Sequence, residues 1–264
     1  PTLSTPKYFP VARNSDGITV WLHPIGEPTN GPANLRIFVN TGSADEIPAE
    51  KGVTGVVTEL LAFKLSALAR KMSVRVHHVV LRSGILFSFE GSAEDVQALG
   101  VAFGQNLQSL SAKSTNSDSI SRAFQSSLRN TIKTNLNHKI IMDEGFGATF
   151  PETRFAHAPV DKKYPIPTTT ILTERIKVIS KAGINIVAAG AIGPKYAVPI
   201  VEALGVRAAN IISPLPSSAK TKRINRKLTS PMLAIDGFMV GTSSISALAG
   251  LFVAREYLDV KLQE

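Results

Sequence analysis

The chain has 264 residues, enough to bury a substantial core as one large or two small domains. Hydrophobic residues make up 44% and charged residues 19%, a balance typical of a globular chain and not of a disordered one. Because there is no cysteine, disulfides and thiolate metal sites are excluded. Lys and Arg number 29 against 20 Asp and Glu, and the net charge of +9 favours acidic partners.

Two strands are expected in the first 40 residues. Residues 1–10 read as an extended arm, and a turn signal at Asp16-Gly17 precedes a β-rich run over 18–22. After a loop rich in Pro, Asn and Gly, residues 35–40 alternate as a half-buried strand. We expect these two strands to form an antiparallel pair.

A long apolar helix is expected next, over residues 53–71. Its apolar side chains lie around much of the circumference, which is typical of a buried helix. A second strand pair is predicted over 75–81 and 84–91. Ser92 and Asp95 form a capping box that opens a helix reaching about residue 110.

The remaining elements are a helix over 120–137, a capped helix over 169–179, a buried strand over 185–190 and a helix over 195–204. We therefore place one domain over residues 1–210. Residues 211–264 are expected to form a linker (213–218), a strand (232–240) and a helix (244–262), the beginning of a second domain. No segment is long and apolar enough to span a bilayer, which needs roughly 20 residues.

The segment 42–64, GSADEIPAEKGVTGVVTELLAFK, resembles the signature of the insulinase/pitrilysin family of zinc peptidases. There a strand ends in a GS-A-x-E sequence and a later glycine opens a helix that carries H-x-x-E-H. The order of elements over about 14–205 is also similar. The resemblance implies an α+β fold, an antiparallel sheet with its helices packed on one face.

The residues that carry the family's chemistry are missing from this segment. Alignment on Gly52 places Gly55 and Glu59 at the two zinc-binding histidines and Thr58 at the catalytic glutamate. Glycine has no donor atom and threonine cannot act as a carboxylate base. The resemblance also implies a third ligand, a glutamate from the helix over 120–137, yet no Asp or Glu occurs between Asp118 and Asp143. We predict no catalytic residue, no bound metal and no cofactor.

Other sites find little support in the sequence. The five histidines (His23, His77, His78, His138 and His157) include no pair at helical spacing, and the adjacent pair His77 and His78 points to opposite faces of a strand. We interpret them as structural or surface histidines. For Glu59 two interpretations remain open: a carboxylate that reaches Arg or Lys at the helix rim, or a remnant site with a raised pKa.

A degenerate member of this family is implied to be a non-catalytic subunit of a larger complex. The first hypothesis is a core-protein-like structural subunit of respiratory complex III, on the matrix side of the mitochondrial inner membrane. A start at Pro1, as after removal of a leader, and the basic charge favour it. The alternative is a non-catalytic partner of an active zinc peptidase of the same family, with a bacterial periplasmic or cytoplasmic location also open.

Partners are therefore expected to be proteins, including a homologous insulinase-family subunit. Nucleic acid is not expected, because the few aromatic residues do not interleave with the basic ones. Anionic lipid could contact one basic run, which contains Lys220, Lys222, Arg223, Arg226 and Lys227.

Overall fold

The computed structural model describes residues 9–13, 17–24, 31–47, 50–112, 115–133 and 166–208. The expected linker, basic run, strand and helix over 211–264 lie outside these residues, as do His138 and His157, and the domain division stays a prediction. Within the described part, no helix has the length and apolarity needed to cross a membrane.

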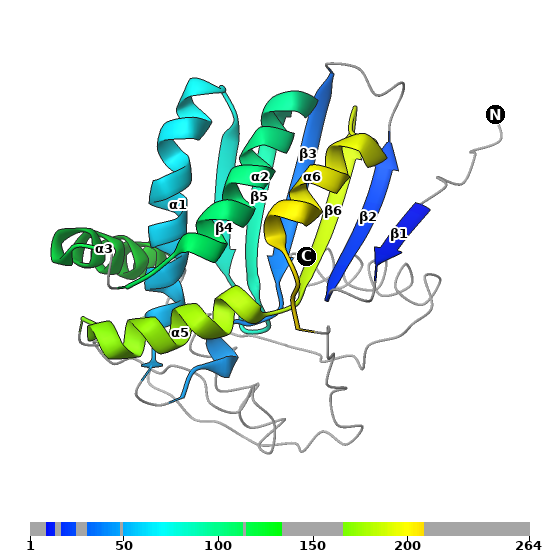
Figure 1. The fold of residues 1–264 in the computed structure, drawn as a ribbon. Coiled ribbons are helices and arrows are strands. Elements are labelled where there is room, and N and C mark those ends of the chain that lie inside the picture. Colours follow the sequence, from blue (N-terminus) through cyan, green and yellow to red (C-terminus); the bar gives the residue numbers. More distant parts are fainter. Residues whose placement is uncertain are drawn as a thin grey trace, which may run out of the picture.

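A six-stranded mixed sheet organises the described residues (Figure 1). Its strands are β1 (Phe9–Arg13), β2 (Ile18–Pro24), β3 (Pro32–Val39), β4 (Arg75–Val80), β5 (Ile85–Ser92) and β6 (Ile184–Gly190), in the spatial order β1-β2-β6-β3-β5-β4. All neighbouring pairs are antiparallel except β2 and β6, which run parallel. The expected α+β class, with helices against one face of a largely antiparallel sheet, is confirmed.

The pairing expected between the first two predicted strands is wrong. The late strand β6 lies between β2 and β3 and hydrogen-bonds to both. Its inward side chains, Ile184, Ile186 and Ala188, are at most 1% exposed. A central, buried position suits this apolar strand, whereas direct β2–β3 pairing would leave it at an edge. The arm expected over residues 1–10 also contains the start of β1, which pairs with β2.

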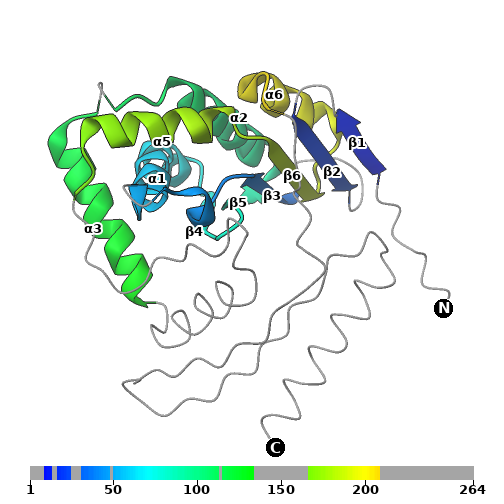
Figure 2. The same cartoon turned by 90° about the horizontal axis from the view of Figure 1, so that it is seen from below.

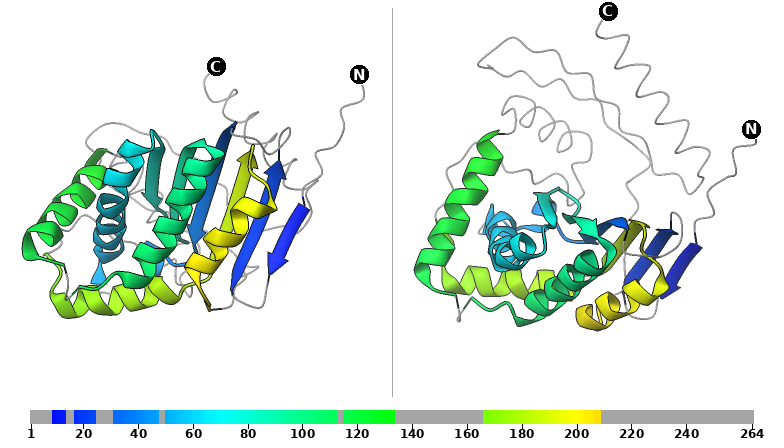
Figure 3. Two further views of the ribbon diagram at one scale, coloured as in Figure 1. Left: turned by 45° about the horizontal axis from the view of Figure 1, so that its top comes forward. Right: turned by 90° about the horizontal axis from the view of Figure 1, so that it is seen from above.

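Five described helices complete the domain. They are α1 (Val53–Lys71), α2 (Ala93–Ser109), α3 (Ser117–Lys133), α5 (Thr169–Lys181) and α6 (Pro194–Leu204). Figure 2 shows α1, α2, α5 and α6 on one side of the sheet, and α3 beside α1 at the β4 end. Figure 3 shows the same layering from two further directions. The core lies between the sheet and this helical layer.

Alternation along β3 shows how the sheet meets that core. Leu35, Ile37 and Val39 are buried, while Arg36 on the opposite face is exposed. The capping expected at α2 is confirmed, since the Ser92 hydroxyl accepts a hydrogen bond from the Asp95 amide at 3.2 Å.

Helix α1 is almost fully buried along its first two and a half turns, whereas its second half keeps Leu65 and Ala69 in the core and exposes its other side. Every residue from Val56 to Ala62 is buried, whereas the apolar side chain of Phe63 is 41% exposed. The reason is its surroundings: α3 and α5 cover the first half of α1 and leave the second half open on the side away from the sheet (Figure 1).

Candidate functional site

The loop before α1 is fixed by its own polar side chains. Gly42 donates its amide to Asp45 Oδ2 at 2.8 Å, and the amides of Ser43 and Ala44 reach the carbonyls of Leu81 and Arg82. Glu46, 3% exposed, accepts hydrogen bonds from the amides of Gly52 at 2.8 Å and Thr54 at 2.7 Å. A carboxylate at a helix N-terminus satisfies unpaired amides and is stabilised by the helix dipole. The GSADE sequence therefore fixes where α1 begins.

Arg175 of α5 binds the same loop from the other side. It is 1% exposed, and its guanidinium donates to the hydroxyls of Thr54 and Thr41 at 2.9 and 3.1 Å. It also donates to the carbonyl oxygens of Gly42 at 2.7 Å and Asp45 at 3.3 Å. Burial lowers the pKa of Arg175, and the nearby charges of Glu46, Asp45 and Glu50 act against that shift. The start of α1 is thus held by a carboxylate and a guanidinium together.

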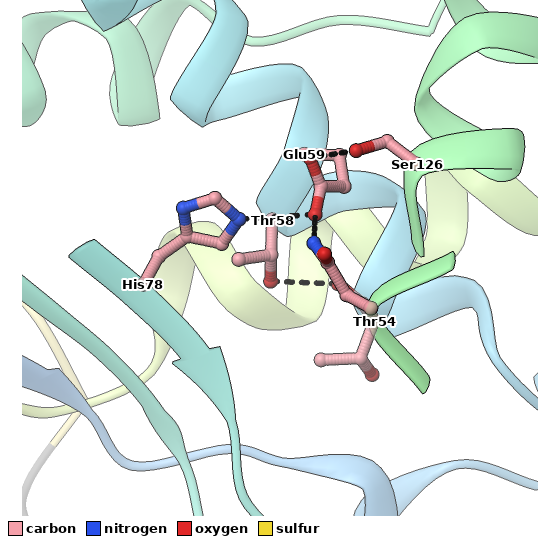
Figure 4. Close-up of polar contacts among 6 residues, drawn as sticks. Thr54, Thr58, Glu59, His78 and Ser126 are labelled. Atoms are coloured by element: carbon pink, nitrogen blue, oxygen red, sulfur yellow. Dashed lines mark hydrogen bonds and ion pairs between the residues drawn. The ribbon is translucent and has the colours of Figure 1, made fainter. Parts of the chain in front are cut away.

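The three degenerate positions lie together near the N-terminal end of α1. Gly55 faces α3, where an added Cβ atom would meet Ser127 Oγ at 2.1 Å. Thr58 is 1% exposed and donates its hydroxyl to the Thr54 carbonyl at 2.8 Å, within the helix. Glu59, one turn after Gly55, also faces α3 and reaches His78 of β4 (Figure 4).

The Glu59 carboxylate joins three elements. His78 Nε2 of β4 lies 3.0 Å from Glu59 Oε1, and Asn130 Nδ2 of α3 donates to the same oxygen at 2.6 Å. The Ser126 hydroxyl, also from α3, donates to Oε2 at 2.8 Å. The Glu59 side chain is 6% exposed and that of His78 21% exposed, and the imidazole stacks on Phe87 with ring centroids 5.6 Å apart. We call Glu59, His78, Ser126 and Asn130 the Glu59 cluster.

Both interpretations offered for Glu59 in the sequence are wrong. Its partners are His78, Ser126 and Asn130 and not an Arg or Lys at the rim. Burial acts to raise the pKa of Glu59. The hydrogen bond and charge of His78 act in the opposite direction, as do the hydrogen bonds from Ser126 and Asn130, and together they bring the pKa below its ordinary value. The carboxylate is therefore stabilised in its ionised form.

The geometry of the cluster does not match nucleophilic catalysis. In a Ser-His-carboxylate triad the imidazole stands between hydroxyl and carboxylate and takes the hydroxyl proton. Here Ser126 donates to Glu59, and His78 meets Glu59 and not Ser126. Because the carboxylate accepts hydrogen bonds from three donors, it links α1 to β4 and α3.

The cluster also lacks the composition of a metal centre. Among the described residues, no group of three or more His, Cys, Asp or Glu side chains is close enough to hold a metal ion. The two adjacent histidines do lie on opposite faces of β4, His77 exposed and His78 half-buried. At the place where the resemblance implies a third zinc ligand, α3 presents Ser126, Ser127 and Asn130 toward α1.

Sequence reasoning missed most of these contacts. Arg175 carried a usable signal, since it interrupts the apolar stripe formed by Leu172, Ile176 and Ile179 on α5. A charge at such a position is buried and must find partners. His78, Ser126 and Asn130 carried no comparable signal, because they come from elements 19 to 71 residues away from Glu59.

Comparison with solved structures shows that this fold is similar to that of peptidase M16 domains. No protein-family model and no curated protein matches the sequence. The structure is similar to a peptidase M16 inactive domain from Pseudomonas fluorescens, at 16% identity and a TM-score of 0.60, over 80% of this chain and 54% of that one.

Two further solved structures show the same fold. The first half of the periplasmic protease PqqL from Escherichia coli matches at 14% identity and a TM-score of 0.62, over 81% of this chain and 50% of that one. A protease from Helicobacter pylori matches at 14% identity and a TM-score of 0.55, over 81% and 54%. The present chain thus spans about half the length of these solved chains.

Proposed function

We propose that this chain is a non-catalytic, peptidase-like domain or subunit that works within a larger assembly. The observation that carries the proposal is the Glu59 cluster. The positions that would hold zinc and its base are a glycine packed against Ser127, a threonine bonded within its helix and a carboxylate already bound by three donors. The loop and helix of the peptidase fold are kept, but structural hydrogen bonds occupy the positions of the zinc ligands and the base. Such a domain contributes to an assembly by binding other proteins through its surface.

Of the two assemblies considered, the partner of an active zinc peptidase has the stronger support. The solved neighbours come from bacteria, and one of them is described as an inactive domain. The similarity to the periplasmic protease PqqL supports a bacterial, periplasmic setting. The alternative, a core-protein-like subunit of mitochondrial respiratory complex III, is supported by the basic charge of the chain and by the loss of the catalytic positions.

Three measurements on the native protein test this proposal: its zinc content, its cleavage of peptides and the identity of its co-purifying partner. Purified from its own source under mild detergent, the chain is expected to hold no stoichiometric zinc and to cleave no peptide library. Its co-purifying partner decides the setting: a chain with an intact H-x-x-E-H indicates the peptidase assembly, and haem-containing membrane subunits indicate complex III. A lone chain with one zinc per molecule and peptidase activity would refute the proposal.

A further inference from the structure

Positive charge gathers at the end of the domain formed by α1, β4 and α3. Six exposed cationic residues lie on these elements, and the exposed acidic residue there is Asp118. We call the six the basic end: Lys64, Arg70, Lys71, Arg75, Arg122 and Arg129. The other two helices over the sheet, α2 and α6, expose Glu94 and Glu202 against Lys195. Figure 1 shows α1, β4 and α3 at one end of the sheet, with α2 over its middle and α6 farther toward β2.

Within the described residues, none of the six cations forms an ion pair, and Arg122 donates Nε to the Asp118 carbonyl of its own helix at 3.4 Å. Neither of the two ion pairs found there, Glu59 with His78 and Glu174 with Lys177, includes any of the six. Helix dipole stabilisation accounts for Arg70 and Lys71 in the last turn of α1, but not for Lys64, Arg75, Arg122 or Arg129. Such a concentration of like charge opposes compact folding and self-association and attracts an opposite charge.

The chemistry of the basic end favours a carboxylate-rich protein surface. Four of the six are arginines, whose planar guanidinium binds carboxylates with two parallel hydrogen bonds. A bilayer would instead require an exposed apolar face beside the charges. On α3 that face is buried, with Ile120, Ala123 and Phe124 inside and polar residues outside. The large apolar side chains exposed on the other two elements are Phe63 of α1 and Val79 of β4. Because they lie on two different elements, they do not form the apolar face of a membrane-bound helix.

We propose that the basic end is a docking surface for an acidic protein partner. The inference rests on the proposed function, because a domain that has lost its chemistry acts through the surfaces that bind its partners. A second copy of this chain is disfavoured, since it would bring two basic ends together.

Binding to poly-L-glutamate tests the surface on the full chain. The variant Lys64→Glu/Lys71→Glu/Arg75→Glu reverses three charges at the basic end. Its matched control, Arg36→Glu/Lys181→Glu/Lys195→Glu, reverses three exposed charges elsewhere and has the same net charge. We expect the first variant to bind at least about tenfold more weakly than the unchanged chain and the control to stay within about twofold.

Two additions keep the result decisive. The independent variant Arg122→Glu/Arg129→Glu on α3 is expected to weaken binding as well, and far-ultraviolet circular dichroism verifies that every variant is folded. Equal loss in the basic-end variant and the control would overturn the proposal, because binding would then follow net charge alone. Tighter binding to vesicles of phosphatidylcholine and phosphatidylglycerol than to poly-L-glutamate would overturn it in favour of a membrane. Zinc content and peptidase activity are measured separately. They test the proposed function independently of the result for poly-L-glutamate binding.

Discussion

At the scale of single residues, Glu59 holds an ionised carboxylate in an almost completely buried position. An isolated buried charge is strongly destabilising, so its three donors determine whether the position is tolerated. Hydrogen bonds to a charged group contribute about 1.5–3 kcal/mol each, more than neutral ones. The same contacts join α1 to β4 and α3.

Glu59→Gln is expected to lower the free energy of unfolding by about 1–3 kcal/mol at neutral pH, because the amide group of Gln faces donors it cannot satisfy. A lowered folded-state pKa means that the Glu59 contribution is present above the ordinary value of 4.5 and is lost as the pH falls through the folded-state pKa. Urea unfolding at pH 7 and at successively lower pH should show the two proteins converging below pH 4.5.

The exposed Glu94→Gln on α2 serves as the control and should change stability by no more than about 0.5 kcal/mol. A constant difference between the unchanged protein and Glu59→Gln over the whole pH range would show that ionisation of Glu59 is not what stabilises the cluster.

Gly55 is expected to reject even a methyl group. Gly→Ala inside a helix ordinarily gains up to about 1 kcal/mol. Here the new Cβ would lie 2.1 Å from Ser127 Oγ, so Gly55→Ala should instead destabilise the domain by about 1–3 kcal/mol. A double-mutant cycle with Ser127→Ala measures the coupling, because that change removes the hydroxyl and leaves the Ser127 Cβ at 3.3 Å. Additive effects of the two changes on the free energy of unfolding would show that Gly55 and Ser127 are not in close contact.

At the scale of elements, Arg175 connects α5 to the loop and first turn that position α1. Its three guanidinium nitrogens bind four oxygen atoms, from Thr41, Gly42, Asp45 and Thr54. Because Glu46 holds the adjacent amides, the loop and the helix start form one hydrogen-bonded unit. This unit holds the loop and the first turn of α1 in one fixed arrangement.

Arg175→Met keeps the length of the side chain but removes every donor. We expect it to lower the free energy of unfolding by about 3 kcal/mol or more, since buried hydroxyl and carbonyl oxygens lose their partner. Hydrogen exchange followed by mass spectrometry should show faster exchange in the peptide that contains Gly42 to Val53. The exposed Lys177→Met, within the same helix, should leave exchange there unchanged. Protection of that peptide in Arg175→Met would contradict the assigned role.

At the scale of the whole molecule, the sheet depends on a strand that enters late in the chain. β6 pairs with β2 over Ile184–Gly190 and with β3 over the same residues, so the two halves of the sheet meet only through it. Contacts between residues so distant in sequence are slow to form and make folding cooperative.

A chain that ends at residue 181 lacks β6 and is expected not to fold. Without the central strand, β1 and β2 have no partner that joins them to β3, β5 and β4, and an isolated hairpin is unstable in water. Near-ultraviolet circular dichroism and proton NMR dispersion compare this fragment with the full chain. Dispersed, native-like signals from the fragment would show that β2 can pair with β3 directly.

The sequence by itself determined the identity of most elements, because hydrophobic periodicity, capping residues and glycines act within a few neighbouring residues. The bounds of α1 and the start of α2 were predicted in this way, and the GSADE and Gly52 resemblance indicated the fold. Tertiary structure alone decided where β6 lies and what surrounds Glu59. Strand order and the partners of a buried charge depend on contacts between residues far apart in the chain, and neither hydrogen bonding in the sheet nor desolvation of a carboxylate leaves a local pattern in the sequence.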